Sequence, residues 1–106
     1  MKLNLLVIRT DNIELLKQQY ELLGFSFDYH QHGKGPFHYA SEAEGLIFEI
    51  YPLSQRAEKA DSSLRLGFEV PNLSKLLLQL EPSSWKILSE ATQKPWSDWV
   101  VSKIAR

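Results

Sequence analysis

The chain has 106 residues, enough for one domain with a hydrophobic core and too few for two independent ones. Its composition, 43% hydrophobic and 24% charged with a net charge of −1, is ordinary for a globular protein and argues against nucleic-acid binding. The absence of cysteine excludes disulfides, thiolate metal sites and cysteine nucleophiles. No apolar run approaches the roughly 20 residues that span a bilayer, and Arg9 comes too early for a signal peptide. We therefore expect a cytoplasmic protein that does not enter membranes.

The first third of the chain predicts a strand followed by a helix. The apolar residues 3–8 indicate a strand buried on both faces. Asp11 with Glu14 three residues later is typical of a capping box at a helix start, and Gly24 is a typical helix stop. Between them, apolar residues recur at helical spacing: Ile13, Leu16, Tyr20 and Leu23.

Three strands are expected to follow this helix. Aromatic and polar residues alternate over residues 25–30, which predicts a strand with one apolar face. Residues 32–36 contain two glycines and a proline and predict a turn, from which residues 37–42 return as a strand. Gly45 indicates another turn before a strand at residues 46–51. The order of the unit is therefore strand, helix, strand, strand, strand.

The second half repeats the first at an offset of 60 residues. Residues 5–16 align with residues 65–76 through these pairs: Leu6 with Leu66, Ile8 with Phe68, Asn12 with Asn72, Ile13 with Leu73 and Leu16 with Leu76. A repeat at this period indicates a duplicated supersecondary unit. A complete second copy would run past residue 106, so we expect its last strand to be missing.

The elements of the second copy are predicted in the same order. Residues 53–62 are a polar linker, and residues 64–70 predict a strand. Asn72 caps a leucine-rich helix that ends at Pro82. Two further strands are expected at residues 85–89 and 99–104.

This order of elements resembles the vicinal oxygen chelate superfamily, which includes glyoxalase I, extradiol dioxygenases, fosfomycin-resistance enzymes and bleomycin-resistance proteins. The most specific stretches are residues 5–14, 20–25, 32–40, 49–52 and 94–96. The resemblance covers residues 1–106 and implies one α+β domain of two tandem βαβββ units, residues 1–52 and 63–106. Together they would form a curled, cup-like mixed sheet whose second unit lacks its last strand. The missing strand has two explanations: the chain is a shortened gene product, or a partner molecule fills the gap. Because family members often dimerise, the resemblance favours a homodimer.

In metal-using members of the family, four positions on the first and last strands of the two units hold one divalent ion. The resemblance places these positions at Leu5, Glu49, Arg65 and beyond Arg106. Leucine has no ligand atom, and a guanidinium is always charged and repels a cation. Glu49 alone does not hold an ion against water, because such sites normally need three or more protein ligands. The expectation is therefore a protein with no metal and no other cofactor.

The three histidines of the chain open an alternative. His30, His32 and His38 lie within nine residues, and the first two share one face if the strand continues through both. His38 can approach them across the hairpin, which gives a cluster of metal-ligand composition. The sequence favours a simpler role, in which His32 and His38 fix the geometry of the turn and bind no metal.

A candidate ligand pocket has two components. Arg65 and Glu49 are expected to meet, either as a structural ion pair or as a site where Arg65 receives an anionic ligand. One histidine and four aromatic residues would line the rest of the pocket: His38, Tyr39, Tyr51, Trp96 and Trp99. The alternative is that the aromatic residues are core or dimer contacts.

These patterns favour a metal-free, non-catalytic protein of the glyoxalase or bleomycin-resistance type that binds a small organic or anionic molecule. One alternative is a metal-dependent lyase, isomerase or dioxygenase that uses Glu49 with the hairpin histidines. A second alternative is a protein–protein interaction module whose working surface is an open sheet edge near Val101.

Overall fold

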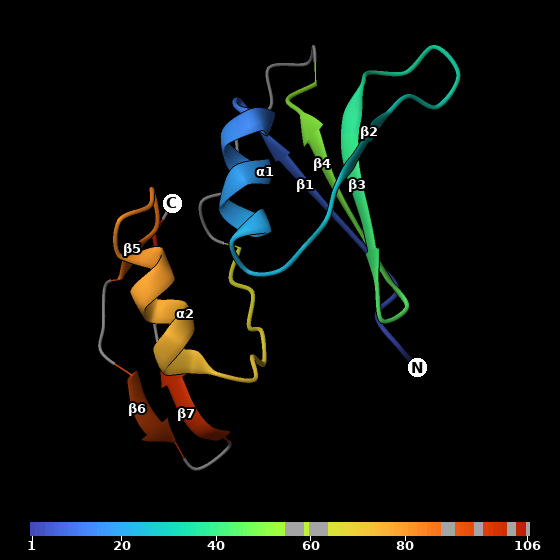
Figure 1. Ribbon diagram of the computed structural model, residues 1–106. Helices are drawn as coiled ribbons and strands as arrows, with labels where there is room; N and C mark the ends of the chain where they lie inside the picture. The colour runs from blue at the N-terminus through green and yellow to red at the C-terminus, as the bar shows by residue number, and fades with distance from the viewer. Residues whose placement is uncertain (55–58, 60–63, 88–90, 95–96, 102–103, 106) are drawn as a thin grey trace. The chain divides into compact units, whose positions relative to one another are not determined.

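The residues that the structure describes form an α+β fold with a four-stranded mixed sheet and two helices (Figure 1). The computed structural model describes the chain apart from residues 55–58, 60–63, 88–90, 95–96, 102–103 and 106. The chain divides into two compact units, Met1–Leu66 and Gly67–Arg106. Within the described residues, no helix is both long and apolar enough to cross a membrane.

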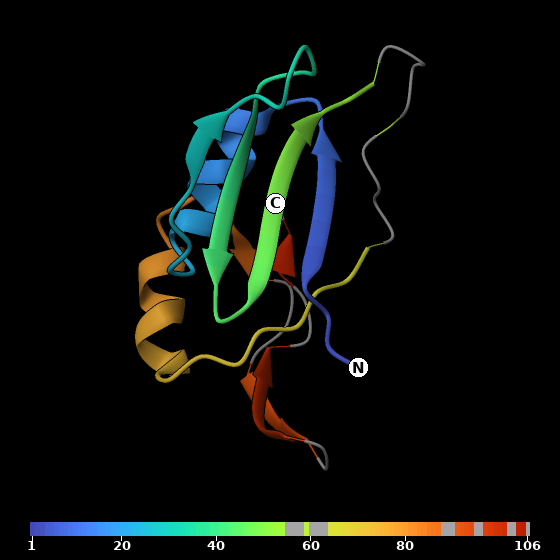
Figure 2. The ribbon, with the colours of Figure 1, turned by 90° about the vertical axis from the view of Figure 1, so that its right-hand side faces the viewer.

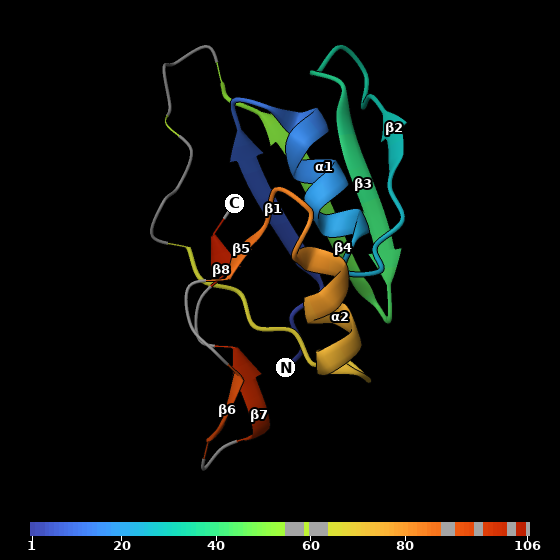
Figure 3. The ribbon, with the colours of Figure 1, turned by 60° about the vertical axis from the view of Figure 1, so that its left-hand side comes forward.

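The first unit is a four-stranded sheet with one helix across one of its faces. Its elements are β1 (Leu5–Thr10), α1 (Ile13–Glu21), β2 (Asp28–His30), β3 (His38–Ala43) and β4 (Leu46–Pro52). The strand order is β1-β4-β3-β2, in which β1 runs parallel to β4 and the other pairs are antiparallel. In Figure 3 the helix α1 lies in front of this sheet, and in Figure 2 it lies behind the sheet. The face turned away from α1 is called the open face below.

The core of the first unit lies between α1 and the sheet. Phe48 and Ile50 of β4 are fully buried, and Leu16 and Tyr20 of α1 are 4% exposed. The Tyr20 and Phe48 rings meet edge to face with centroids 4.9 Å apart. Phe25 adds a second edge contact to Phe48 at 5.2 Å. Because side chains alternate along a strand, these buried residues send their neighbours on β4 to the open face.

Strand β1 departs from the sequence-based expectation in position and in burial. It occupies Leu5–Thr10 rather than residues 3–8. It is also not buried on both faces, since Leu5 and Val7 are 50% and 41% exposed while Ile8 is buried. The reason is that β1 is an edge strand and α1 covers only one face of the sheet. The prediction of a strand buried on both faces is therefore wrong, because an apolar sequence can also form an edge strand with one exposed face.

The start of α1 also differs from the prediction. Its N-cap is Asn12, whose side-chain oxygen accepts a hydrogen bond from the Leu15 amide at 3.0 Å. The predicted capping box of Asp11 and Glu14 is wrong, because Glu14 accepts a hydrogen bond from the Tyr39 hydroxyl of β3. Gly24, with a φ of 105°, follows the helix as predicted, since few residues other than glycine adopt this conformation.

The hairpin and the last strand agree with the sequence prediction to within a few residues. β3 and β4 begin close to the predicted residues 37 and 46. β2 is shorter than expected and starts at Asp28, because Phe25 and Phe27 pack against Phe48 before the strand begins.

The second unit contains one helix and two short antiparallel ladders. Its elements are α2 (Leu73–Leu80), β5 (Lys86–Ile87), β6 (Ala91–Lys94), β7 (Ser97–Val101) and β8 (Ile104–Ala105). β5 pairs with β8, and β6 pairs with β7. The predicted cap Asn72 is confirmed, since its side chain accepts from the Lys75 amide at 3.1 Å.

One predicted strand of this unit is wrong, and one strand was not predicted. Residues 64–70 form no strand. In the first unit β1 is held by β4, whereas the described strands of the second unit pair only with one another. A strand without a partner leaves its backbone groups unpaired. The unpredicted strand is β6. Much of the expected linker lies outside the described residues, as do parts of the strands expected at residues 85–89 and 99–104.

Candidate metal centre

Three histidines from one hairpin meet on the open face. His30 ends β2 and pairs in register with His38, the first residue of β3. His32 lies two residues beyond His30, in the turn. The centroids of the three rings lie 4.5 to 4.9 Å apart. The turn that brings them together is closed by a hydrogen bond of 3.0 Å from the Gly35 amide to the His32 carbonyl, and its Gly33 has a φ of 58°.

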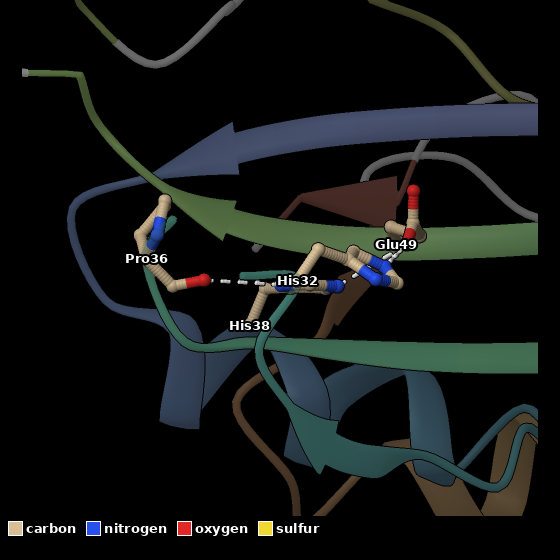
Figure 4. Close-up of polar contacts among 4 residues, drawn as sticks. All are labelled: His32, Pro36, His38 and Glu49. Atoms are coloured by element: carbon tan, nitrogen blue, oxygen red, sulfur yellow. Dashed lines mark hydrogen bonds and ion pairs between the residues drawn. The ribbon is translucent and has the colours of Figure 1, made fainter. Parts of the chain in front are cut away.

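A carboxylate from the neighbouring strand completes the cluster. Glu49 lies on β4 between the buried residues Phe48 and Ile50, so its side chain projects from the open face. Its Oε2 lies 3.2 Å from Nε2 of His38 and 3.7 Å from Nε2 of His32, as the dashed lines in Figure 4 mark. One ligand atom from each of the four residues, the three histidines and Glu49, lies within 4.8 Å of all the others.

The side chains of the cluster differ widely in exposure. The side chain of His38 is 0% exposed and that of Glu49 is 14% exposed, whereas that of His32 is 66% exposed. His30 is half-buried, and its Nε2 is shielded from solvent without a hydrogen-bond partner. The cluster therefore has a buried part, built on β3 and β4, and a part that faces solvent.

The hydrogen bonds of His38 indicate which of its nitrogens carries the proton. Its Nδ1 lies 3.2 Å from the Pro36 carbonyl oxygen, which can only accept, so Nδ1 is the donor (Figure 4). In the neutral ring, Nε2 then presents a lone pair to the Glu49 oxygen, which is also an acceptor. The contact between them lacks hydrogen-bond geometry, and Nε2 has no other partner. A shielded Nε2 lone pair that faces a carboxylate oxygen at 3.2 Å is unfavourable unless a cation, either a metal ion or a proton on Nε2, lies between them.

Tyr51 and Arg9 extend the polar part of the open face. The Tyr51 ring stacks on the His38 ring with centroids 4.0 Å apart and an angle of 10°. Arg9 of β1 places its guanidinium carbon 5.0 Å from the centre of the Tyr51 ring and donates to the Pro52 carbonyl at 3.1 Å. Burial raises the pKa of Tyr51, the charge of Glu49 raises it further, and Arg9 opposes both. Tyr51 is therefore an uncharged ring that covers one face of the His38 ring.

The structure brings together some of the predicted pocket residues and separates others. His38, Glu49 and Tyr51 share the open face. Tyr39 lies on the opposite face, where its hydroxyl donates to Glu14, and this hydrogen bond together with burial raises its pKa to about 12. Tyr39 is thus part of the contact between α1 and β3.

The structure does not show the expected pair of Glu49 with Arg65 among the described residues. Arg65 is exposed, and the nitrogens that lie within 4.0 Å of the Glu49 carboxylate are Nε2 of His32 and Nε2 of His38. The physical reason is that residues 64–70 form no strand, so no sheet register holds Arg65 near β4. Trp96 lies outside the described residues, and Trp99 is described only as a backbone position in β7.

Among the polar residues of the open face, Arg9 was not predicted from the sequence. The available signal was its place two residues after Val7 on a strand whose odd-numbered residues face one way. The histidines were recognised as a cluster, and their proximity is confirmed. Leu5, where the resemblance placed a first metal position, lies half-exposed on the open face.

Comparisons with known proteins show the fold alone. No family model matches the chain, and no curated protein matches it. An integron cassette protein from the mobile metagenome of V. cholerae has a similar structure, with a TM-score of 0.57 and 19% identity over 92% of this chain and 80% of that one. A protein from the mobile metagenome of V. pseudocholerae is similar at a TM-score of 0.59 and 20% identity, over 92% of this chain and 79% of that one.

Proposed function

We propose that the open face of the first unit binds one divalent transition-metal ion and that the protein acts through this ion. The ligands are Nε2 of His38, a carboxylate oxygen of Glu49 and one ring nitrogen each from His30 and His32. The proposal is carried by one observation: a fully buried His38 Nε2 and the Glu49 oxygen face each other at 3.2 Å without a hydrogen bond. A cation between them converts an unfavourable contact into two bonds.

The geometry of the cluster suits such an ion. Metal–nitrogen bonds of about 2.0–2.1 Å place neighbouring ligands of a tetrahedral site roughly 3.3 Å apart. The His38–Glu49 separation of 3.2 Å already has this value, and the His32–Glu49 separation of 3.7 Å needs a small movement. The four ligand atoms lie within 4.8 Å of one another, so the wider pairs close further around an ion. The Pro36 carbonyl supplies the outer hydrogen bond that normally fixes the ring of a metal-binding histidine.

The donor set selects the type of metal. Imidazole nitrogens favour zinc, nickel, copper and iron over magnesium and calcium, which prefer oxygen ligands. With three neutral imidazoles and one carboxylate, we propose Zn²⁺, Ni²⁺, Co²⁺ or Fe²⁺. Where a coordination position is open to water or substrate, such an ion polarises a bound oxygen and lowers the pKa of bound water. The corresponding activity is the metal-dependent lyase, isomerase or dioxygenase class, with Glu49 and the histidines as the metal ligands.

Metal binding is tested directly on untagged protein stripped with a chelator, because an affinity tag of histidines would mask the result. Isothermal titration with Zn²⁺, Ni²⁺, Co²⁺ and Mn²⁺ should give one ion per chain for the first three. Free ion at a hundredfold excess over its dissociation constant should stabilise the fold by about 2.7 kcal/mol. Glu49→Ala should abolish the stoichiometric binding, whereas Glu42→Ala, a change at an exposed glutamate of the neighbouring strand β3, should retain it.

The metal-free binding protein expected from the sequence is the second candidate. It is favoured by the stack of Arg9, Tyr51 and His38, which offers a cation and aromatic surface to a small anionic or aromatic molecule. On this candidate the titration shows no stoichiometric ion, and Arg9→Ala rather than Glu49→Ala weakens ligand binding. The homodimer stays a prediction, tested by the elution volume of the protein at micromolar concentration.

The tandem βαβββ arrangement of the glyoxalase type is also a proposal. It is supported by the first unit, whose β1 runs parallel to β4 in the expected order. It is supported further by the two caps at the repeat offset of 60 residues: Asn12 has φ −143° and ψ 86°, and Asn72 has φ −145° and ψ 89°. The metal ligands proposed above differ from the family's four positions, since only Glu49 is common to both sets.

A further inference from the structure

We propose that His32 is an exchangeable ligand of this metal centre and that a small anionic donor molecule takes its place. The inference rests on the proposed metal site and assigns different roles to its ligands. His30, His38 and Glu49 would hold the ion permanently. His32 would close the fourth position until an incoming anion displaces it.

The difference in burial separates the two kinds of ligand. The His32 side chain is 66% exposed, whereas those of Glu49 and His38 are 14% and 0% exposed. A ligand that leaves the ion must find new partners, and water supplies them only to an exposed ring. For His38 the same movement would bury an unpaired nitrogen, which costs about 1–3 kcal/mol. His30 is more exposed than these two residues, but its Nε2 is shielded and has no partner, so its departure from the ion would also leave a nitrogen unpaired.

The position of each ligand in the sheet gives the same division. His30 and His38 are held by the register between β2 and β3, and Glu49 is held by β4 between two neighbouring strands. His32 lies beyond the end of β2, in the turn that contains Gly33 and Gly35. It also lies farther from Glu49 than His38 does, at 3.7 Å against 3.2 Å. His32 can therefore move with its turn while the other three ligands stay in place.

Charge decides what enters the position that His32 leaves. A divalent ion with one carboxylate and neutral imidazoles keeps one net positive charge. A small anion with an oxygen or nitrogen donor, such as a carboxylate, is the ligand that this field favours.

The experiment uses Co²⁺ as the probe metal and azide as the probe anion. Wild type, His32→Ala, His30→Ala and His38→Ala are loaded with Co²⁺, and each fold is checked by circular dichroism. We expect His32→Ala to keep one Co²⁺ per chain with an affinity loss of about tenfold or less. His30→Ala and His38→Ala should lose more than about 100-fold, since removal of an outer-shell partner alone costs about 10–100-fold. His30→Ala keeps the test decisive if the change at buried His38 prevents folding.

The anion is followed through the visible absorption bands of bound Co²⁺. Azide should shift the bands of the wild type, and it should do so at about tenfold lower concentration in His32→Ala, where it no longer competes with the imidazole. Two results would refute the exchange of His32 without refuting the metal site. One is an equal loss of Co²⁺ affinity in His32→Ala and His30→Ala. The other is absorption bands that azide leaves unchanged in both the wild type and His32→Ala. A wild type that binds no Co²⁺ would instead refute the proposed function itself.

Discussion

Replacement of Glu49 by glutamine distinguishes a metal site from a structural ion pair through the sign of a stability change. In the metal-free protein, the Glu49 oxygen lies 3.2 Å from a buried His38 nitrogen that is already an acceptor. Glu49→Gln places an amide N–H at this position, which can donate to that nitrogen. A neutral hydrogen bond contributes about 0.5–1.5 kcal/mol, so the metal-free variant should be as stable as the wild type or up to about 1 kcal/mol more stable.

The structural alternative predicts the opposite change. If His38 were a cation paired with Glu49, the glutamine would leave a buried charge without its partner, at a cost of about 3–5 kcal/mol. The assay is urea unfolding at neutral pH in excess chelator, with Glu42→Gln as the matched control on the neighbouring strand β3. A loss of about 3 kcal/mol in Glu49→Gln alone would refute the reasoning that assigns a lone pair to His38 Nε2.

Three further predictions concern the fold of the two units. Tyr39→Phe should lower the free energy of unfolding by about 1–2 kcal/mol through loss of its hydrogen bond to Glu14, as measured by urea unfolding, and an unchanged value would contradict that role. Because the pKa of Tyr39 is raised from 10.0 to about 12, its contribution is complete below pH 10 and is lost as the pH rises towards 12, a dependence that Tyr39→Phe should remove. Phe48→Ala should cost about 3–5 kcal/mol in the same assay, since the ring is 0% exposed; a cost below about 1 kcal/mol would mean that the core described here is wrong. Asn12→Ala and Asn72→Ala should each cost about 1 kcal/mol, seen in thermal unfolding, if both are true N-caps.

Local patterns in the sequence predicted the elements whose stability is local. The turn at residues 32–36, the strand β4 and the helix α2 with its cap Asn72 were all predicted, because turn residues, apolar alternation and helix caps act over a few residues. The cap of α1 was missed by one position. Asp11 and Asn12 are both good caps, and the choice depends on Glu14, which is engaged by a tyrosine 25 residues away.

Features that depend on distant partners were not predictable in the same way. Residues 64–70 have the apolar pattern of β1, but no described strand pairs with them, and they form no strand. The exposure of Val7 depends on which face of the sheet α1 covers, and the sequence of β1 alone does not determine that face.

The candidate site combines a feature that local sequence predicts with features that depend on distant residues. The proximity of the three histidines followed from hairpin geometry, whereas the part of Glu49 in the cluster required the register between β3 and β4. The decisive detail, a buried His38 nitrogen without a hydrogen bond, exists only in three dimensions.

X-ray absorption at the zinc edge tests the central claim most directly, with untagged protein that is loaded with one equivalent of Zn²⁺ and passed through gel filtration. We predict retention of the ion, a first shell of nitrogen and oxygen ligands at about 2.0–2.2 Å, and the outer-shell scattering of imidazole rings. The imidazole scattering should fall in His30→Ala. Loss of the ion on gel filtration, or a shell of oxygen ligands without imidazole, would contradict a metal centre on the open face.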